Sequence, residues 1–205
     1  MQKIGSVSVL GKGCVGIVIG ARINSRTIAL KIRRTDADRT NMKNEATMLE
    51  KANSINVGPK LLGYSDNFLL MELIDGQLMD EWMEQHPSER DKDLVKNVLR
   101  EYLDQCFRLD CLKLDHGELS QARRHLLVYE DHARIVDFET ASTSRKPANV
   151  SSICQYLFVS SNVALRVGEM LGKVELDQLR QALSKYKKTK SATAFVEVLR
   201  ACKLV

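Results

Sequence analysis

Glycine and lysine residues near the start of the chain have the types and spacing needed to hold the phosphates of a nucleotide. Glycines allow backbone conformations that other residues avoid and let N–H groups come close to phosphate oxygens, while a lysine supplies a positive charge. We expect ATP contacts from Gly11, Lys12, Gly13, Cys14, Val15, Gly16, Val18, Ala29 and Lys31. A glycine-rich hairpin that binds no ligand is the alternative.

The context of these glycines is strand, turn, strand. The β-branched runs at 17–19 and 28–32 are separated by the turn-like Asn24-Ser25, and no helix is predicted after the glycines. A dinucleotide-binding fingerprint needs its last glycine at a helix start, and a Walker A loop needs Gly-Lys-Ser/Thr, which this chain lacks. The context therefore favours the hairpin that protein kinases lay over phosphates.

A helix is predicted over residues 39–53, where apolar residues recur at helical spacing. Glu45 lies within it and is the predicted ion-pair partner of Lys31. Glu50 competes for this role, and an ordinary solvent-exposed glutamate is the alternative to both.

Two strands are predicted next, at residues 60–64 and 68–73, before Asp75-Gly76 interrupts the pattern. This is where a kinase chain would pass from its sheet lobe to its helical lobe. Backbone groups available to adenine are then expected at Glu72, Leu73 and Ile74.

The second half of the chain is predicted to be mainly helical and to carry two acidic residues at loop edges. A wide apolar stripe within residues 80–112 predicts a helix with a buried face. Glu118 follows it in a polar segment, and Asp137 closes a strand pair that begins at Leu126.

Together these features resemble the protein-kinase-like superfamily, on the branch of the RIO kinases and the small kinase of the tRNA threonylcarbamoylation (KEOPS) complex. His116-Gly117-Glu118 stands where this branch has His-Gly-Asp, and Asp137-Phe138-Glu139 stands where kinases have Asp-Phe-Gly. The segment at 145–150 resembles the short tail that follows in this branch. The resemblance covers nearly the whole chain.

The resemblance implies a single α+β domain over residues 1–205 with the two-lobed kinase fold. Residues 1–76 would form the N-lobe, a small antiparallel sheet with one helix, and residues 77–205 a mainly helical C-lobe. It further implies use of ATP with Mg²⁺ and a serine or threonine hydroxyl as acceptor. Related families act on ribosome precursors or tRNA-modifying assemblies, so a protein substrate or partner associated with RNA or the ribosome is also expected.

Roles follow from the resemblance position by position. The glycines would cover the phosphates, Lys31 would hold the α- and β-phosphates, and Glu45 would fix the lysine. Asp137 would bind magnesium, and Glu118 would accept or orient the substrate hydroxyl. His116 would have a scaffold role.

Three departures from the kinase pattern affect chemistry. Glu118 is one methylene longer than aspartate, which moves its carboxylate by roughly 1.5 Å, an error that can cost about a hundredfold in rate. The asparagine that supplies a second magnesium contact is replaced by Arg123, or by His125 if the loop has two extra residues, and neither side chain suits magnesium. Glu139 in place of glycine restricts the backbone of the metal motif, so no switchable motif is expected.

These observations leave three functions open. The first is a small RIO-like ATP-dependent serine/threonine kinase or ATPase. The second is a pseudokinase that binds ATP and acts as a sensor or scaffold. The third is a small-molecule phosphotransferase of the aminoglycoside-kinase type, although the chain lacks the large helical insertions that usually shape such acceptor sites.

The amino-acid composition is compatible with all three functions and does not distinguish among them. The net charge is +5, and part of it is gathered at 185–190, where lysines could contact nucleic-acid phosphates or simply end a helix. Five cysteines without Cys-x-x-Cys spacing argue for a reducing interior. We find neither a leader signal nor an apolar run long enough to span a bilayer, so a soluble, cytoplasmic protein without membrane association is expected.

Overall fold

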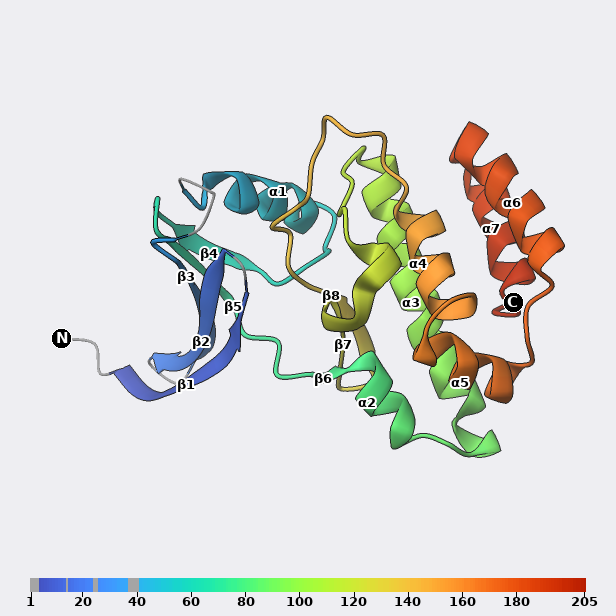
Figure 1. The fold of residues 1–205 in the computed structure, drawn as a ribbon, viewed down its shortest axis with the longest axis horizontal. Coiled ribbons are helices and arrows are strands. Elements are labelled where there is room, and N and C mark those ends of the chain that lie inside the picture. Colours follow the sequence, from blue (N-terminus) through green and yellow to red (C-terminus); the bar gives the residue numbers. More distant parts are fainter. Residues whose placement is uncertain (1–3, 14, 24–25, 37–40) are drawn as a thin grey trace. The chain divides into compact units, whose positions relative to one another are not determined.

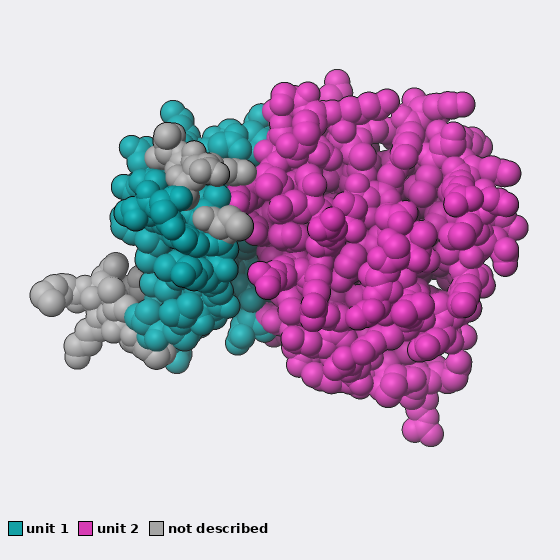
Figure 2. All heavy atoms as spheres, in the orientation of Figure 1, with its two compact units in different colours: residues 1–75 teal, residues 76–205 magenta. Residues whose placement is uncertain are grey.

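The computed structural model describes residues 4–13, 15–23, 26–36 and 41–205 of the chain. The chain divides into two compact units, Met1–Asp75 and Gly76–Val205, which we call the N-terminal and C-terminal units (Figure 2).

The N-terminal unit is a five-stranded antiparallel sheet with one helix (Figure 1). The strand order is β1-β2-β3-β5-β4, and the bounds are β1 Ile4–Lys12, β2 Gly16–Ile23, β3 Arg26–Arg33, β4 Leu61–Tyr64 and β5 Phe68–Glu72. Helix α1, Lys43–Asn53, buries Ala46, Leu49 and Ala52 on one face, as its apolar spacing predicts. It begins later than predicted, and Arg39 lies outside the described residues.

The C-terminal unit is mainly helical (Figure 1). Its helices are α2 Met79–Glu84, α3 Lys92–Cys111, α4 Asn149–Phe158, α5 Asn162–Leu171, α6 Leu176–Thr189 and α7 Ala192–Ala201, with short 3₁₀ helices at Glu89–Asp91 and Leu119–Arg124. A small antiparallel sheet has the order β6 Gln77–Leu78, β7 Leu126–Tyr129 and β8 His132–Ile135. The expected α+β class, a small antiparallel sheet with one helix followed by a mainly helical part, is confirmed.

The core of the C-terminal unit is built around α3. Val98, Leu99 and Leu103 on this helix are fully buried, as the apolar stripe predicts. The Tyr102 hydroxyl donates a hydrogen bond to the Leu127 carbonyl at 2.6 Å, which ties the helix to β7. The helix therefore fixes the strand pair that ends just before Asp137.

Two helices differ from the sequence prediction, which places no helix at residues 162–171 and ends the next helix at Lys185. Helix α5 was not predicted; it is capped by Ser161, whose hydroxyl accepts the Ala164 N–H at 2.9 Å. Helix α6 runs on to Thr189, so Lys187 and Lys188 lie in its last turn, and Lys190 ends it in the left-handed conformation. Lys185 contacts Glu197 at 2.5 Å and Lys190 donates to the Pro147 carbonyl at 2.7 Å, so both lysines have partners within the unit.

None of the helices in the described part of the chain is long and apolar enough to cross a membrane. The cysteines at 106, 111, 154 and 202 are free thiols, and Cys14 lies outside the described residues.

Candidate functional site

The glycine segment forms the turn between β1 and β2. Across the hairpin, Gly11 pairs with Val18 and Lys12 pairs with Ile17, and the Gly13 N–H donates to the Gly16 carbonyl at 2.8 Å. The predicted order of strand, turn and strand is therefore present. Cys14, one of the predicted nucleotide contacts, lies outside the described residues.

These glycines are not needed for unusual backbone angles. In the described part of the chain the glycines with positive φ are Gly58, Gly117 and Gly172, and the hairpin glycines Gly11, Gly13 and Gly16 are not among them. The requirement at Gly16 is spatial, because a Cβ there would lie 2.9 Å from the Ile32 carbonyl oxygen and 3.0 Å from Cγ of Lys31. A side chain at position 16 would therefore collide with the Lys31 side chain.

Lys31 and Glu45 form a buried ion pair in the N-terminal unit. The lysine lies on β3 opposite Val18, and its Nζ is 2.9 Å from Oε1 of Glu45 on α1. Both residues are only 4% exposed, whereas the competing Glu50 is exposed on the same helix. Removing one partner of a buried ion pair leaves an uncompensated charge and destabilises the fold by about 3–5 kcal/mol. The Lys31 ammonium group is therefore held beside the Glu45 carboxylate. Ala29, two residues before the lysine, is also buried.

The predicted adenine-contacting segment follows β5. The Glu72 N–H donates to the Lys60 carbonyl at 2.8 Å, so this backbone donor is already used within the sheet. Leu73 and Ile74 come after the strand and are half-buried.

In the C-terminal unit, Glu118, His125 and Asp137 lie together, and we call them the Glu118–His125–Asp137 cluster. Glu118 and His125 flank the 3₁₀ helix at 119–124, and Asp137 follows β8. Nε2 of His125 is 3.4 Å from Oε2 of Glu118, and Nδ1 is 4.0 Å from Oδ2 of Asp137. Each residue can offer a ligand atom, and these atoms lie within 4.8 Å of one another.

Arg123 and His125, the two candidates for the asparagine position, lie differently in the structure. The Arg123 side chain is 76% exposed, and its Nε lies 3.3 Å from Oδ2 of Asp80. His125 is the candidate that lies beside the two acids, Glu118 and Asp137.

Asp137 has a left-handed backbone, with φ +69°. Aspartate tolerates this region better than most residues, and such backbone strain is often found at functional sites. Glu139 is not among the described residues with positive φ, so its position does not require a glycine.

His116 packs beneath the cluster and is fully buried. Its ring lies 5.1 Å from the Phe138 ring and 5.5 Å from the His125 ring. Nε2 must donate its hydrogen bond to the Val136 carbonyl at 3.1 Å, because a carbonyl only accepts. Burial lowers the pKa of His116 to about 4, so the ring is neutral near pH 7. These contacts agree with a scaffold role.

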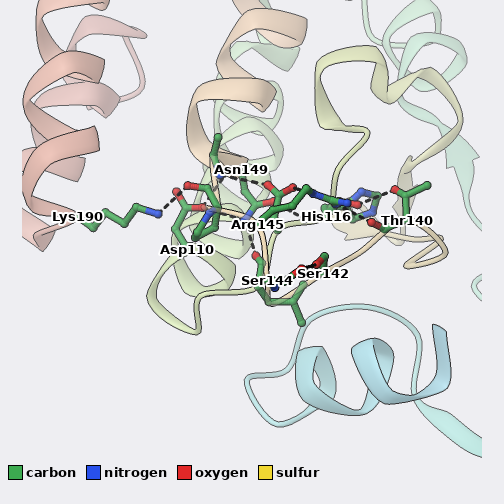
Figure 3. Close-up of polar contacts among 12 residues, drawn as sticks. Asp110, His116, Thr140, Ser142, Ser144, Arg145, Asn149 and Lys190 are labelled. Atoms are coloured by element: carbon green, nitrogen blue, oxygen red, sulfur yellow. Dashed lines mark hydrogen bonds and ion pairs between the residues drawn. The ribbon is translucent and has the colours of Figure 1, made fainter. Parts of the chain in front are cut away.

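A buried hydrogen-bond network holds the segment that carries Glu118 (Figure 3). Asn149 at the start of α4 accepts the His116 N–H at 2.9 Å, and its amide group donates to Asp110 at 2.8 Å and to the Leu114 carbonyl at 2.7 Å. Asp110 also accepts the Tyr186 hydroxyl at 2.9 Å. Asp110 and Tyr186 are not predicted from the sequence, because residue type alone does not show that an aspartate at a helix end is buried.

A second set of contacts joins this segment to the residues after the metal motif (Figure 3). The Thr140 hydroxyl donates to the His116 carbonyl at 2.9 Å, and Arg145 donates to Asp115 at 2.9 Å and to the Thr140 carbonyl at 2.6 Å. Between them Gly117 has φ +95°, and a Cβ there would lie 2.6 Å from Arg145 and 2.8 Å from Thr140. The two loops are thus held together on either side of a required glycine.

Comparison with known proteins adds family information to this geometry. The sequence model of the RIO domain matches residues 21–153, more than half of the chain. The chain belongs to the RIO domain family. This family is protein-kinase-like, in agreement with the resemblance inferred from the motifs. The matched residues of this RIO domain include the Lys31–Glu45 pair and the Glu118–His125–Asp137 cluster, while the glycines of the hairpin precede them.

A relative of this RIO-domain chain is the uncharacterized protein MJ1211 of Methanocaldococcus jannaschii. The two are 31% identical over 120 residues, which are 58% of this chain and 99% of the relative. The relative supports a shared fold and carries no assigned activity.

Proposed function

We propose that this RIO-domain protein is a small atypical ATP-dependent kinase or ATPase that transfers the γ-phosphate of Mg-ATP to a serine or threonine hydroxyl. The observation that carries the proposal is the buried Lys31–Glu45 ion pair. Protein kinases use such a pair, between a strand lysine and a helix glutamate, to hold the lysine that binds the ATP phosphates. The acceptor is a protein, with an RNA- or ribosome-associated assembly as the partner class.

Nucleotide binding in this proposal uses the residues of the glycine hairpin and the adjoining strand. Lys31 binds the α- and β-phosphates as a fixed positive charge, and Glu45 keeps it in position. Backbone N–H groups of the hairpin cover the phosphates, and Gly16 leaves the lysine its space. Leu73 and Ile74 offer backbone groups to the adenine, with the Glu72 carbonyl beside them.

The acidic residues of the C-terminal unit have the chemistry for a metal-assisted transfer. Mg²⁺ prefers oxygen ligands, which Asp137 and Glu118 supply. When bound, the ion neutralises charge on the phosphates. Asp137 holds the ion, and Glu118 accepts or orients the proton of the acceptor hydroxyl.

A pseudokinase is the second candidate, and one contact favours it. Nε2 of His125 lies 3.4 Å from the Glu118 carboxylate, so the ring competes with a substrate hydroxyl for that acid. In this case the protein binds ATP without turnover and acts as a nucleotide sensor or scaffold.

Transfer of radiolabelled γ-phosphate tests the proposal. Wild-type protein with ATP and divalent metal should show autophosphorylation or phosphate release, and Asp137→Asn and Glu118→Gln should each lose about a hundredfold or more. Glu130→Gln, an exposed acid in the turn after β7, is the matched control and should behave as wild type. Transfer undiminished by the first two changes would overturn the mechanism. ATP binding without transfer would favour the pseudokinase.

A further inference from the structure

His125 brings a nitrogen ligand into a site where kinases use oxygen. Its two ring nitrogens face different carboxylates, Glu118 at 3.4 Å and Asp137 at 4.0 Å. The side chain is 13% exposed, and Nδ1 is buried without a hydrogen-bond partner in the described part of the chain. A buried acceptor directed at a carboxylate is costly unless a cation or proton joins them.

The separations suit a shared cation. Metal–ligand bonds to histidine nitrogen and carboxylate oxygen are about 2.1 Å long, so two of them span at most about 4.2 Å. Both His125–carboxylate separations fall below this limit. A cation can therefore join the imidazole to either acid without a large movement.

The donor set argues against magnesium as the preferred ion. Mg²⁺ demands oxygen ligands in near-octahedral geometry, whereas imidazole suits first-row transition metals, which bind mixed nitrogen and oxygen sites more tightly. The two carboxylates keep the site acceptable to Mn²⁺ as well as to softer ions.

We propose that the Glu118–His125–Asp137 cluster binds a divalent first-row transition-metal ion, such as Mn²⁺, in preference to Mg²⁺, and that His125 sets this preference. This inference rests on the proposed function, since it names the metal ion of the same site. It goes further in assigning a ligand role to a residue that the kinase pattern does not contain.

Metal binding to the nucleotide-free protein tests this assignment. The probe is Mn²⁺, measured through the electron paramagnetic resonance signal of the free ion and then displaced by Mg²⁺. His125→Asn should weaken Mn²⁺ binding about tenfold or more while changing Mg²⁺ binding less, so the ratio of the two affinities falls. The matched control is His132→Asn, because His132 also lies beside a carboxylate, Glu101 at 2.9 Å, but is 61% exposed and does not belong to the Glu118–His125–Asp137 cluster. It should retain the wild-type ratio.

The possible outcomes separate the two proposals. An unchanged ratio in His125→Asn, or no Mn²⁺ binding by the wild type up to millimolar concentrations, would overturn the metal assignment. Asp137→Asn, which keeps the size of the side chain, should weaken both ions, and circular dichroism shows whether each variant is folded. The metal measurement involves neither nucleotide nor turnover. If the ratio of Mn²⁺ to Mg²⁺ affinity depends on His125 but the protein transfers no phosphate, the kinase proposal is refuted and the metal assignment stands.

Discussion

The imidazole of His125 contacts the carboxylate of Glu118, with Nε2 and Oε2 3.4 Å apart. These residues are two of the departures from the kinase pattern, and the structure places them side by side. A glutamate and an imidazole thus lie next to each other in the loop that carries the His-Gly-Glu motif. Substitutions of Glu118, of His125 and of the residues that hold their loop in place therefore test the chemistry of this loop.

Asn149 is the residue whose loss should most disturb this support. Asn149→Ala removes the acceptor of the His116 N–H and the donor to the Leu114 carbonyl, leaving both buried and unpaired. We expect the free energy of unfolding to fall by about 2–4 kcal/mol, measured by urea denaturation. Tyr186→Phe removes a single hydroxyl from Asp110 and should cost about 1 kcal/mol. Equal effects of the two changes would contradict a central role for the asparagine.

His116 should make stability depend on pH. Burial lowers its pKa from 6.5 to about 4, so the unfolded chain takes up a proton at a higher pH than the native protein does. This contribution to stability is complete above the unfolded pKa and is lost as the pH falls toward 4. The free energy of unfolding should drop by about 2 kcal/mol between about pH 7 and about pH 5 from this residue alone. His116→Gln should show a shallower dependence over the same range, and an identical dependence would refute the assignment.

Gly117 should not tolerate a side chain. Gly117→Ala must accommodate φ +95° and a Cβ that meets Arg145 and Thr140, so we expect a loss of about 1 kcal/mol or more in urea denaturation. Gly168→Ala is the control in the same unit, because it lies within α5 and its nearest neighbour is the flexible Lys173 side chain at 3.3 Å. It should be neutral or slightly stabilising. A harmless Gly117→Ala would mean that the two loops are not held as described.

The sequence predicted the elements but not the networks that join them. Runs of β-branched residues located the strands around Lys31, and helical spacing of apolar residues located the buried face of α3. Pairing of Lys31 with Glu45 rather than Glu50 depends on how α1 lies against the sheet, which spacing alone leaves open. That His125 rather than Arg123 lies beside Glu118 depends on an irregular 3₁₀ segment, whose path the sequence does not predict. Helix α5 was missed although most of its residues are apolar, and Gly168 within it lowers the helix propensity of the segment.

Gly16 and Gly11 give a matched pair of predictions in the hairpin. Gly16→Ala places a Cβ against the Ile32 carbonyl and the Lys31 side chain, so it should cost about 1–3 kcal/mol in the free energy of unfolding. Gly11→Ala meets no atom within 4 Å and should change stability by less than about 0.5 kcal/mol. Thermal and urea denaturation measure both. A similar cost at the two positions would show that close approach to the lysine is not what requires the glycine.

Equilibrium binding of ATP, measured by isothermal titration calorimetry, tests the central claim most directly, because the kinase and the pseudokinase both require it. Wild-type protein should bind ATP, and Lys31→Met should weaken binding about tenfold or more through loss of a charge-assisted contact. Lys51→Met, an exposed lysine on α1, should bind as wild type does. Glu45→Gln is a second variant that retains the side-chain size and should also weaken binding. No ATP binding by the folded wild-type protein, or equal binding by the wild type and Lys31→Met, would contradict the account.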